Sequence, residues 1–177
     1  MQFEPTTIEG LIAVRLQRHE DERGSFARLF CTHEFAAKGL VTAFVQESLS
    51  VTRLAGTIRG MHYQRPPQAE VKFVRCVRGA VYDVVADLRP ESSSYLRWQG
   101  FHLSAENDLA LYIPKGCAHG FQSLKDNSEI LYHMDTPYNP FASDGFRYDD
   151  PTIEISWPRP IRMIAEKDLA WPALSSR

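Results

Sequence analysis

The sequence predicts an all-β protein, a double-sheet jelly roll with short peripheral helices, and three observations favour this class. The chain has 177 residues, the length of one domain, so we expect a single domain over residues 1–177. Its middle region holds short apolar runs about ten residues apart, separated by turn residues, which is typical of a β-sandwich or barrel. Helical patterns are scarce and do not alternate with the strands, so a parallel α/β sheet is not expected.

Five strands are predicted in the middle of the chain. Each is short and rich in β-branched, aromatic and other apolar residues. Their expected ranges are 71–77, 81–88, 95–103, 109–113 and 130–134. In the second of these strands the residues alternate between two faces. One face carries Tyr82, Val84, Ala86 and Leu88, and the other carries Val81, Asp83, Val85 and Asp87.

Two short helices are expected outside this region. Residues 32–38 begin with Thr32 as a candidate N-cap and end before Gly39, a common helix stop. Residues 165–170 form a second candidate, a single turn that ends before Pro172. The chain contains no Gly-x-Gly arrangement, which excludes both a Rossmann dinucleotide site and a Walker phosphate loop.

Composition excludes several classes of protein. Hydrophobic residues make up 44% and charged residues 24%, so the chain is globular rather than disordered. The net charge of −2 provides no field for general nucleic-acid binding. No apolar run approaches the length of a membrane span, and no signal peptide is apparent at the N-terminus. The three cysteines, Cys31, Cys76 and Cys117, form no disulfide framework, which favours a reducing, cytoplasmic location.

Two glycine-flanked histidine segments are the first candidates for chemistry. They cover residues 56–64, which contain His62, and residues 113–121, which contain His119. Glycine beside a histidine lets the backbone turn sharply or approach a ligand closely. The Pro-x-Gly-x-x-His pattern that ends at His119 follows an apolar strand and is similar to the second motif of the cupin superfamily of jelly-roll proteins.

A metal site is not expected. Metal-binding cupins carry a His-x-His first motif, whereas here Gln64 stands two residues after His62 and is a poor ligand for a transition metal. His62 and His119 remain, and two imidazoles rarely hold zinc or iron without a third protein ligand.

Several more segments have distinctive sequences. In chain order, the main ones are residues 21–26, 59–64, 72–79, 82–89, 103–107, 113–121, 149–151, 155–158 and 166–168. Together they resemble the dTDP-4-dehydrorhamnose 3,5-epimerases, a cupin-like family of nucleotide-sugar epimerases. The resemblance runs from about Gly10 to about Pro172.

The resemblance implies an epimerase that needs no cofactor. Its substrate would be a nucleotide-diphospho-4-keto-6-deoxyhexose, in which C3 and C5 both flank a ketone. A base removes a proton to give an enolate, and an acid returns a proton from the opposite face. By resemblance His62 is the base, Asp168 its partner, Tyr132 the acid, and Lys72 the cation beside the enolate oxygen. Judged by local sequence alone, Tyr132 also fits a core aromatic residue, and Asp168 fits an ordinary charge on a helical turn.

The resemblance also names residues that bind substrate. Arg23 and Arg59 match the binders of the diphosphate, since a guanidinium fits phosphate oxygens well. Tyr138 matches an aromatic residue that stacks on the nucleotide base, and it also fits a plain loop aromatic. The remaining matches are Phe26, Gln46, His119 and Lys167. Strict alternation would place Arg59 and His62 on opposite faces of a strand, and a bulge at Gly60 would resolve this conflict.

The nucleotide end departs from the family pattern at Arg28, Ser48, Ser143 and Tyr148. The nucleotide is therefore either dTDP bound differently or another one, such as CDP. The family further implies a homodimer that exchanges N-terminal strands, so that Arg23 serves the neighbouring site. Two other functions stay open: a single-centre epimerase or ketoisomerase on a related sugar, and a non-catalytic jelly roll that binds sugar nucleotides.

Overall fold

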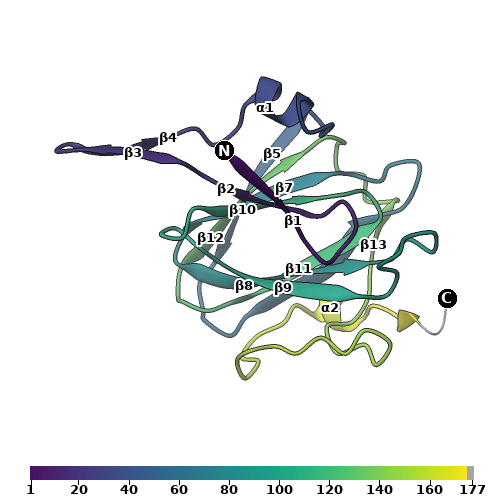
Figure 1. Ribbon diagram of the computed structural model, residues 1–177. Helices are drawn as coiled ribbons and strands as arrows, with labels where there is room; N and C mark the ends of the chain where they lie inside the picture. The colour runs from purple at the N-terminus through teal and green to yellow at the C-terminus, as the bar shows by residue number, and fades with distance from the viewer. Residues whose placement is uncertain (175–177) are drawn as a thin grey trace.

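The computed structural model describes residues 1–174, which form two large antiparallel sheets, a separate hairpin and two short helices (Figure 1). The strands are β1 (Gln2–Pro5), β2 (Ile12–Arg15), β3 (Arg18–Asp21), β4 (Gly24–Ala27), β5 (Gln46–Thr52), β6 (Ile58–Gln64), β7 (Lys72–Arg78), β8 (Ala80–Asp87), β9 (Trp98–Ser104), β10 (Leu109–Ile113), β11 (Cys117–Ser123), β12 (Ser128–Met134) and β13 (Ser143–Gly145). The helices are α1 (Thr32–Ala36) and α2 (Glu166–Leu169). The predicted all-β jelly roll with short peripheral helices is confirmed.

The two sheets interleave strands from distant parts of the sequence. One sheet has the order β1-β2-β10-β7-β12-β5, and the other has the order β13-β6-β11-β8-β9. Strands β3 and β4 pair only with each other and project away from both sheets, on the left of Figure 1. Because consecutive strands often join different sheets, residues far apart in the sequence face each other across the interior.

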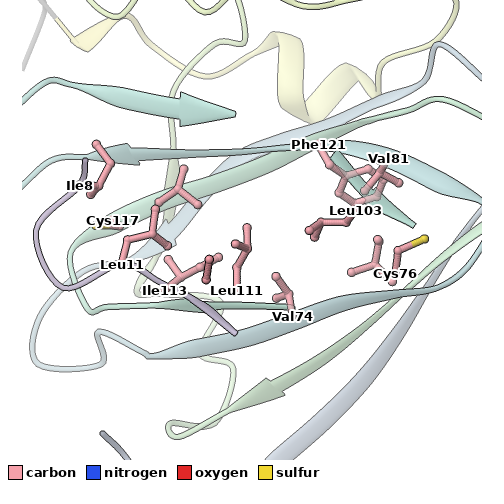
Figure 2. Close-up of a cluster of buried hydrophobic side chains, with 13 residues drawn as sticks. Ile8, Leu11, Val74, Cys76, Val81, Leu103, Leu111, Ile113, Cys117 and Phe121 are labelled. Atoms are coloured by element: carbon pink, nitrogen blue, oxygen red, sulfur yellow. The ribbon is translucent and has the colours of Figure 1, made fainter. Parts of the chain in front are cut away.

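An apolar core lies between the two sheets (Figure 2). Val74 and Leu111 come from one sheet, while Val81, Leu103 and Phe121 come from the other. All five side chains are at most 1% exposed. Burial on this scale is the main favourable contribution to folding, and it fixes the spacing of the sheets.

The outer faces of the sheets are also partly covered. Helix α1 places Phe35 on the six-stranded sheet, against the rings of Phe73 and Tyr112. The segment after β13 crosses the other sheet and packs Ile153 and Trp157 against it. The C-terminal part of the chain is thereby brought to the sheet that carries β6 and β11.

Most predicted elements appear with shifted ends, and two details were wrong. The strand predicted over 95–103 begins only at Trp98, because residues 92–97 form turns that close on the buried carboxylate of Asp87. Thr32 is not the N-cap of α1: Cys31 holds that position, without a side-chain cap. The predicted strand 109–113 and the helix stop at Gly39, whose φ is +69°, are confirmed, and the turn predicted over 165–170 is helical over Glu166–Leu169.

The expected bulge in β6 is present. Between the pairs His119–His62 and Phe121–Arg59, β6 advances three residues while β11 advances two. Gly60 lies inside this irregularity with a φ of +128°, a conformation that favours glycine. The extra residue lets Arg59 and His62 line the same cavity.

No helix within residues 1–174 is long and apolar enough to cross a membrane. Residues 175–177, the end of the predicted single domain, lie outside the described residues, and the domain assignment stays a prediction.

Candidate active site

A cavity of about 970 Å³ is lined by residues from both large sheets. Strands β6 and β11 contribute from one sheet, while β5, β7 and β12 contribute from the other. The segment from Met163 to Trp171, which includes α2, completes the wall beside β6. The site therefore combines side chains from two facing sheets and from the C-terminal part of the chain.

His62 and Asp168 form a hydrogen-bonded pair in this cavity. Nε2 of His62 lies 2.7 Å from Oδ1 of Asp168, and the other carboxylate oxygen accepts the N–H of Gly60 at 3.3 Å. The His62 side chain is 33% exposed, whereas Asp168 is 2% exposed. The carboxylate is thus buried behind an imidazole that faces the cavity.

The environment of Asp168 keeps it ionised. Burial opposes the charge, but the hydrogen bonds from His62 and the Gly60 N–H, with the charge of Lys167, outweigh it and lower the pKa of Asp168. An ionised carboxylate accepts the Nε2–H of a neutral ring, which leaves the lone pair on Nδ1. His62 is therefore held in the tautomer of a base, and Asp168 stabilises the imidazolium that forms when the ring takes a proton.

A second imidazole–carboxylate pair lies deeper in the same wall. Nε2 of His119 is 2.8 Å from Oδ2 of Asp83, and the two side chains are 4% and 0% exposed. Burial raises the pKa of Asp83, against the lowering influence of His119 and Lys72. This pair fixes the ring of His119 at the edge of the cavity, where it meets the ring of Tyr132 at 5.8 Å between centroids.

Tyr132 and Lys72 come from the opposite sheet. Burial, and then the charge of Asp83, raise the pKa of the Tyr132 hydroxyl far above its usual range, despite a lowering effect of Arg59. The phenol therefore stays protonated at neutral pH, and its O–H can donate a hydrogen bond into the cavity. Lys72 shares its face of β7 with the core residues Val74 and Cys76, as predicted, and its Nζ donates to the backbone oxygen of His62 at 3.1 Å.

Polar and aromatic groups line the rest of the cavity. Arg59 donates to Thr52 Oγ1 at 3.0 Å and to the backbone oxygen of Val51 at 3.1 Å. Gln46 accepts the backbone N–H of Tyr138 at 2.9 Å, which ties the loop after β12 to β5. The Tyr138 side chain is 62% exposed. An exposed ring and a guanidinium that line one cavity suit a ligand with a planar base and phosphates.

Gln64 has a structural task. Its side chain donates to the backbone oxygens of Gln68 and Pro137 and accepts the N–H of Asn139. Both the nitrogen and the oxygen of the amide thus take part in joining two loops. Within residues 1–174, no group of three or more His, Cys, Asp or Glu side chains is arranged to hold a metal ion.

Comparison with known proteins identifies the family of this chain. Residues 5–176 match the protein family described as dTDP-4-dehydrorhamnose 3,5-epimerase. The chain belongs to the dTDP-4-dehydrorhamnose 3,5-epimerase family. A member from Sinorhizobium fredii is 37% identical over 175 residues, which cover 98% of this chain and 90% of that protein.

Solved structures of family members have the same fold. The dTDP-4-dehydrorhamnose 3,5-epimerase of Elizabethkingia anophelis has a TM-score of 0.96 and 33% identity, covering 100% of this chain and 98% of that one. A 3,5-epimerase of Legionella pneumophila, in complex with dTDP-4-keto-L-rhamnose, has a TM-score of 0.91 and 33% identity, covering 98% of this chain and 93% of that one. The resemblance inferred from the motifs is confirmed.

The structure brings most of the residues implied by the epimerase family into one cavity. These are His62, Lys72, Tyr132, Asp168, Gln46, Arg59, His119, Tyr138 and Lys167. Arg23 and Phe26 are not among them. Arg23 lies at the tip of the β3–β4 hairpin, paired with Asp21 at 2.6 Å, and Phe26 is 74% exposed. Neither side chain lines the cavity of its own chain.

The departures from the epimerase pattern fall in different places. Ser48 and Ser143 line the cavity. Arg28 instead pairs with Glu34 of α1 at 2.9 Å, and Tyr148 lies outside the cavity lining. Two of the four departures can therefore affect what the cavity of this chain binds.

Sequence reasoning missed three residues of the site. Alternation places Asp83 on one face of β8 but does not predict its contact with His119. The signal for that contact is an acidic residue within an otherwise apolar strand. Glu70 lies in a loop with no motif of its own, and Trp171, whose ring centroid is 6.3 Å from that of His62, follows a helical turn. Neither of the last two had a local signal.

Proposed function

We propose that this cavity inverts C3 and C5 of dTDP-4-dehydro-6-deoxyglucose and yields dTDP-4-dehydrorhamnose through enolate intermediates. The observation that carries the proposal is the placement of a base and an acid on opposite walls. His62 comes from the sheet of β6, and Tyr132 comes from the sheet of β12. Removal of a proton on one face and delivery on the other inverts a carbon beside a ketone.

Each step has a group suited to it. His62, oriented by Asp168, takes the proton from C5 or C3 at Nδ1. Lys72 stabilises the negative charge that develops on the C4 oxygen, where a fixed cation lowers the barrier most. Tyr132 then donates its phenolic proton to the opposite face. The charge and the protons balance within these groups, so the reaction requires no change in oxidation state.

Arg59, Gln46, Tyr138 and Lys167 are proposed to bind the nucleotide diphosphate, with His119 orienting the sugar. We further propose a homodimer in the cytoplasm. In this proposal the hairpin that carries Arg23 and Phe26, which projects away from both sheets, enters the cavity of a second copy. This arrangement would give both residues the substrate contacts that they lack in their own chain.

The test is incubation with dTDP-4-dehydro-6-deoxyglucose in deuterated water, followed by NMR of C3 and C5. We expect deuterium at both carbons and inverted product. Exchange at only one carbon would support the single-centre alternative, and exchange at neither would contradict the proposal.

A parallel reaction with the CDP-linked sugar tests which nucleotide the cavity accepts. Activity is expected to survive prolonged EDTA treatment, because Gln64 replaces a metal ligand.

A further inference from the structure

Lys72 is largely withdrawn from solvent, and it pairs there with a carboxylate that no motif marks. Oε1 of Glu70 lies 2.9 Å from Lys72 Nζ, and the two side chains are 6% and 13% exposed. Both residues line the cavity. A buried ion pair is weak evidence for stability, because desolvation of two charges offsets most of their attraction. The pair therefore invites a functional explanation.

The second oxygen of Glu70 supports this view. Oε2 is buried and has no hydrogen-bond partner among residues 1–174. An unsatisfied buried acceptor costs about 1–3 kcal/mol, and more when it is charged. Asp87 shows the contrast, since its buried carboxylate is bonded by Arg89, Ser92 and Ser94. The Glu70 carboxylate is thus held in place although its Oε2 accepts no hydrogen bond from residues 1–174.

The backbone on both sides of Glu70 is fixed by three side chains from neighbouring segments. The bonds run from Gln64 Nε2 to the oxygen of Gln68 at 2.9 Å, from Thr136 Oγ1 to the oxygen of Ala69 at 3.3 Å, and from the N–H of Val71 to Asp135 Oδ1 at 2.7 Å. The position of the carboxylate is therefore set before any ligand binds, as a preorganised site requires.

Lys72 has three N–H donors. One meets Glu70 Oε1, and a second meets the backbone oxygen of His62 at 3.1 Å. One donor remains. We propose that Glu70 is a positioning residue: it holds the Lys72 ammonium beside His62 so that this remaining donor serves the C4 oxygen of the keto sugar. The inference deepens the proposed function and rests on it.

Two variants of Glu70 separate this role from a general structural one. Glu70→Met removes the acceptor at similar volume and is expected to lower kcat by about 10- to 100-fold, the scale of a misplaced stabilising group, while KM and dTDP affinity change less than about threefold. Glu70→Gln keeps an oxygen that accepts from Lys72 and should stay within about threefold of wild type. Glu4→Gln, in an exposed pair with Arg15, is the control for loss of a carboxylate.

A double-mutant cycle with Lys72→Met gives the sharpest test. If Glu70 acts through Lys72, Glu70→Met will change the exchange rate by less than about twofold in the Lys72→Met background. Apolar replacement of both partners of a buried pair is often neutral for folding, so the double variant stays measurable even if Glu70→Met is unstable. Thermal unfolding of each variant accompanies the kinetics.

Wild-type kcat in a folded Glu70→Met would overturn the inference, and so would effects of Glu70→Met and Lys72→Met that multiply. A loss in Glu70→Gln as large as in Glu70→Met would also overturn it. Failure of the proposed function is distinct, because it would appear as absence of deuterium exchange in the wild-type protein.

Discussion

His62 and Asp168 stand 106 residues apart in the sequence, and Nε2 of one lies 2.7 Å from Oδ1 of the other. The contact joins the bulged strand β6 to the short turn α2. It orients the imidazole, and it depends on how the C-terminal segment crosses the sheet. Removing each member of the pair therefore tests a different part of the proposed chemistry.

Replacing His62 by Ala should abolish deuterium exchange at both C3 and C5, because the cavity then has no base in the proposed position. Binding of dTDP should stay nearly unchanged, since the nucleotide contacts lie elsewhere in the cavity. NMR exchange and calorimetric titration measure the two effects. His33→Ala, an exposed histidine on α1, is the matched control. Exchange at the wild-type rate in His62→Ala would refute the assignment.

Asp168→Asn should lower kcat by about 10²-fold or more while the protein stays folded, because the amide no longer stabilises the imidazolium. The residual activity should exceed that of His62→Ala, since the base itself is still present. Steady-state kinetics and thermal unfolding measure both properties. Asp149→Asn, which breaks an exposed pair with Arg147, is the control. Unchanged kcat in Asp168→Asn would show that the pair is structural only.

Tyr132→Phe should uncouple exchange from inversion. His62 and Lys72 remain, so the enolate forms, but His62 returns the proton to the face from which it came. Deuterium then enters with retention, while inversion falls by about 10²-fold or more. Tyr112→Phe, a buried tyrosine outside the cavity, controls for loss of a hydroxyl. A ratio of exchange to inversion equal to that of wild type would exclude Tyr132 as the acid.

Gly60→Ala should destabilise the fold and reduce activity. An added Cβ would lie 2.6 Å from Cα of Gly120 and 3.0 Å from the oxygen of His119. Gly24 has nearly the same φ, +129° against +128°, but nothing lies within 4 Å of its Cβ position. Gly24→Ala thus shares the backbone strain, and the steric contact should cost Gly60→Ala about 1–3 kcal/mol more. Equal losses in chemical denaturation would contradict the packing described for the bulge.

Asp87 predicts a pH dependence of stability. Burial alone would raise its pKa, but hydrogen bonds from Arg89, Ser92 and Ser94 outweigh burial and lower the pKa to about 2 from 3.8. A depressed carboxyl pKa stabilises the fold above the unfolded value, and this contribution is lost as the pH falls toward the folded value. At pH 7 the contribution is about 2 kcal/mol, and about half of it should be lost by pH 3.

The measurement for Asp87 is urea denaturation of wild type and Asp87→Asn between pH 7 and pH 3. The difference in unfolding free energy should shrink as the pH falls. A difference that stays constant over this range would show that the Asp87 carboxyl titrates alike in the folded and unfolded chains.

Local patterns predicted the parts of the fold that depend on neighbouring residues. The strand 109–113, the stop at Gly39 and the need for a bulge at Gly60 all follow from alternation and glycine chemistry within a few positions. The predicted start of β9, residue 95, was wrong because Ser92 and Ser94 close a turn on the carboxylate of Asp87. That closure depends on a buried carboxylate from another strand.

The sequence by itself determined the all-β class, the family and the two glycine-flanked histidines, because each is written in residues close together along the chain. For β8 it determined that Asp83 and Asp87 share a face, since alternation is a local property. It did not determine that this face points inward, because both faces of the strand are covered. That choice follows from the C-terminal segment, which packs over the other face.

Only the tertiary structure decided which groups meet in the cavity. His62 meets Asp168, His119 meets Asp83, and Tyr132 faces them from the opposite sheet. These contacts join strands and turns from distant parts of the chain, and their geometry is set by sheet order, register and the packing between the layers. The sequence gives the chemical type of each side chain, but the packing of the whole fold determines which side chains come into contact.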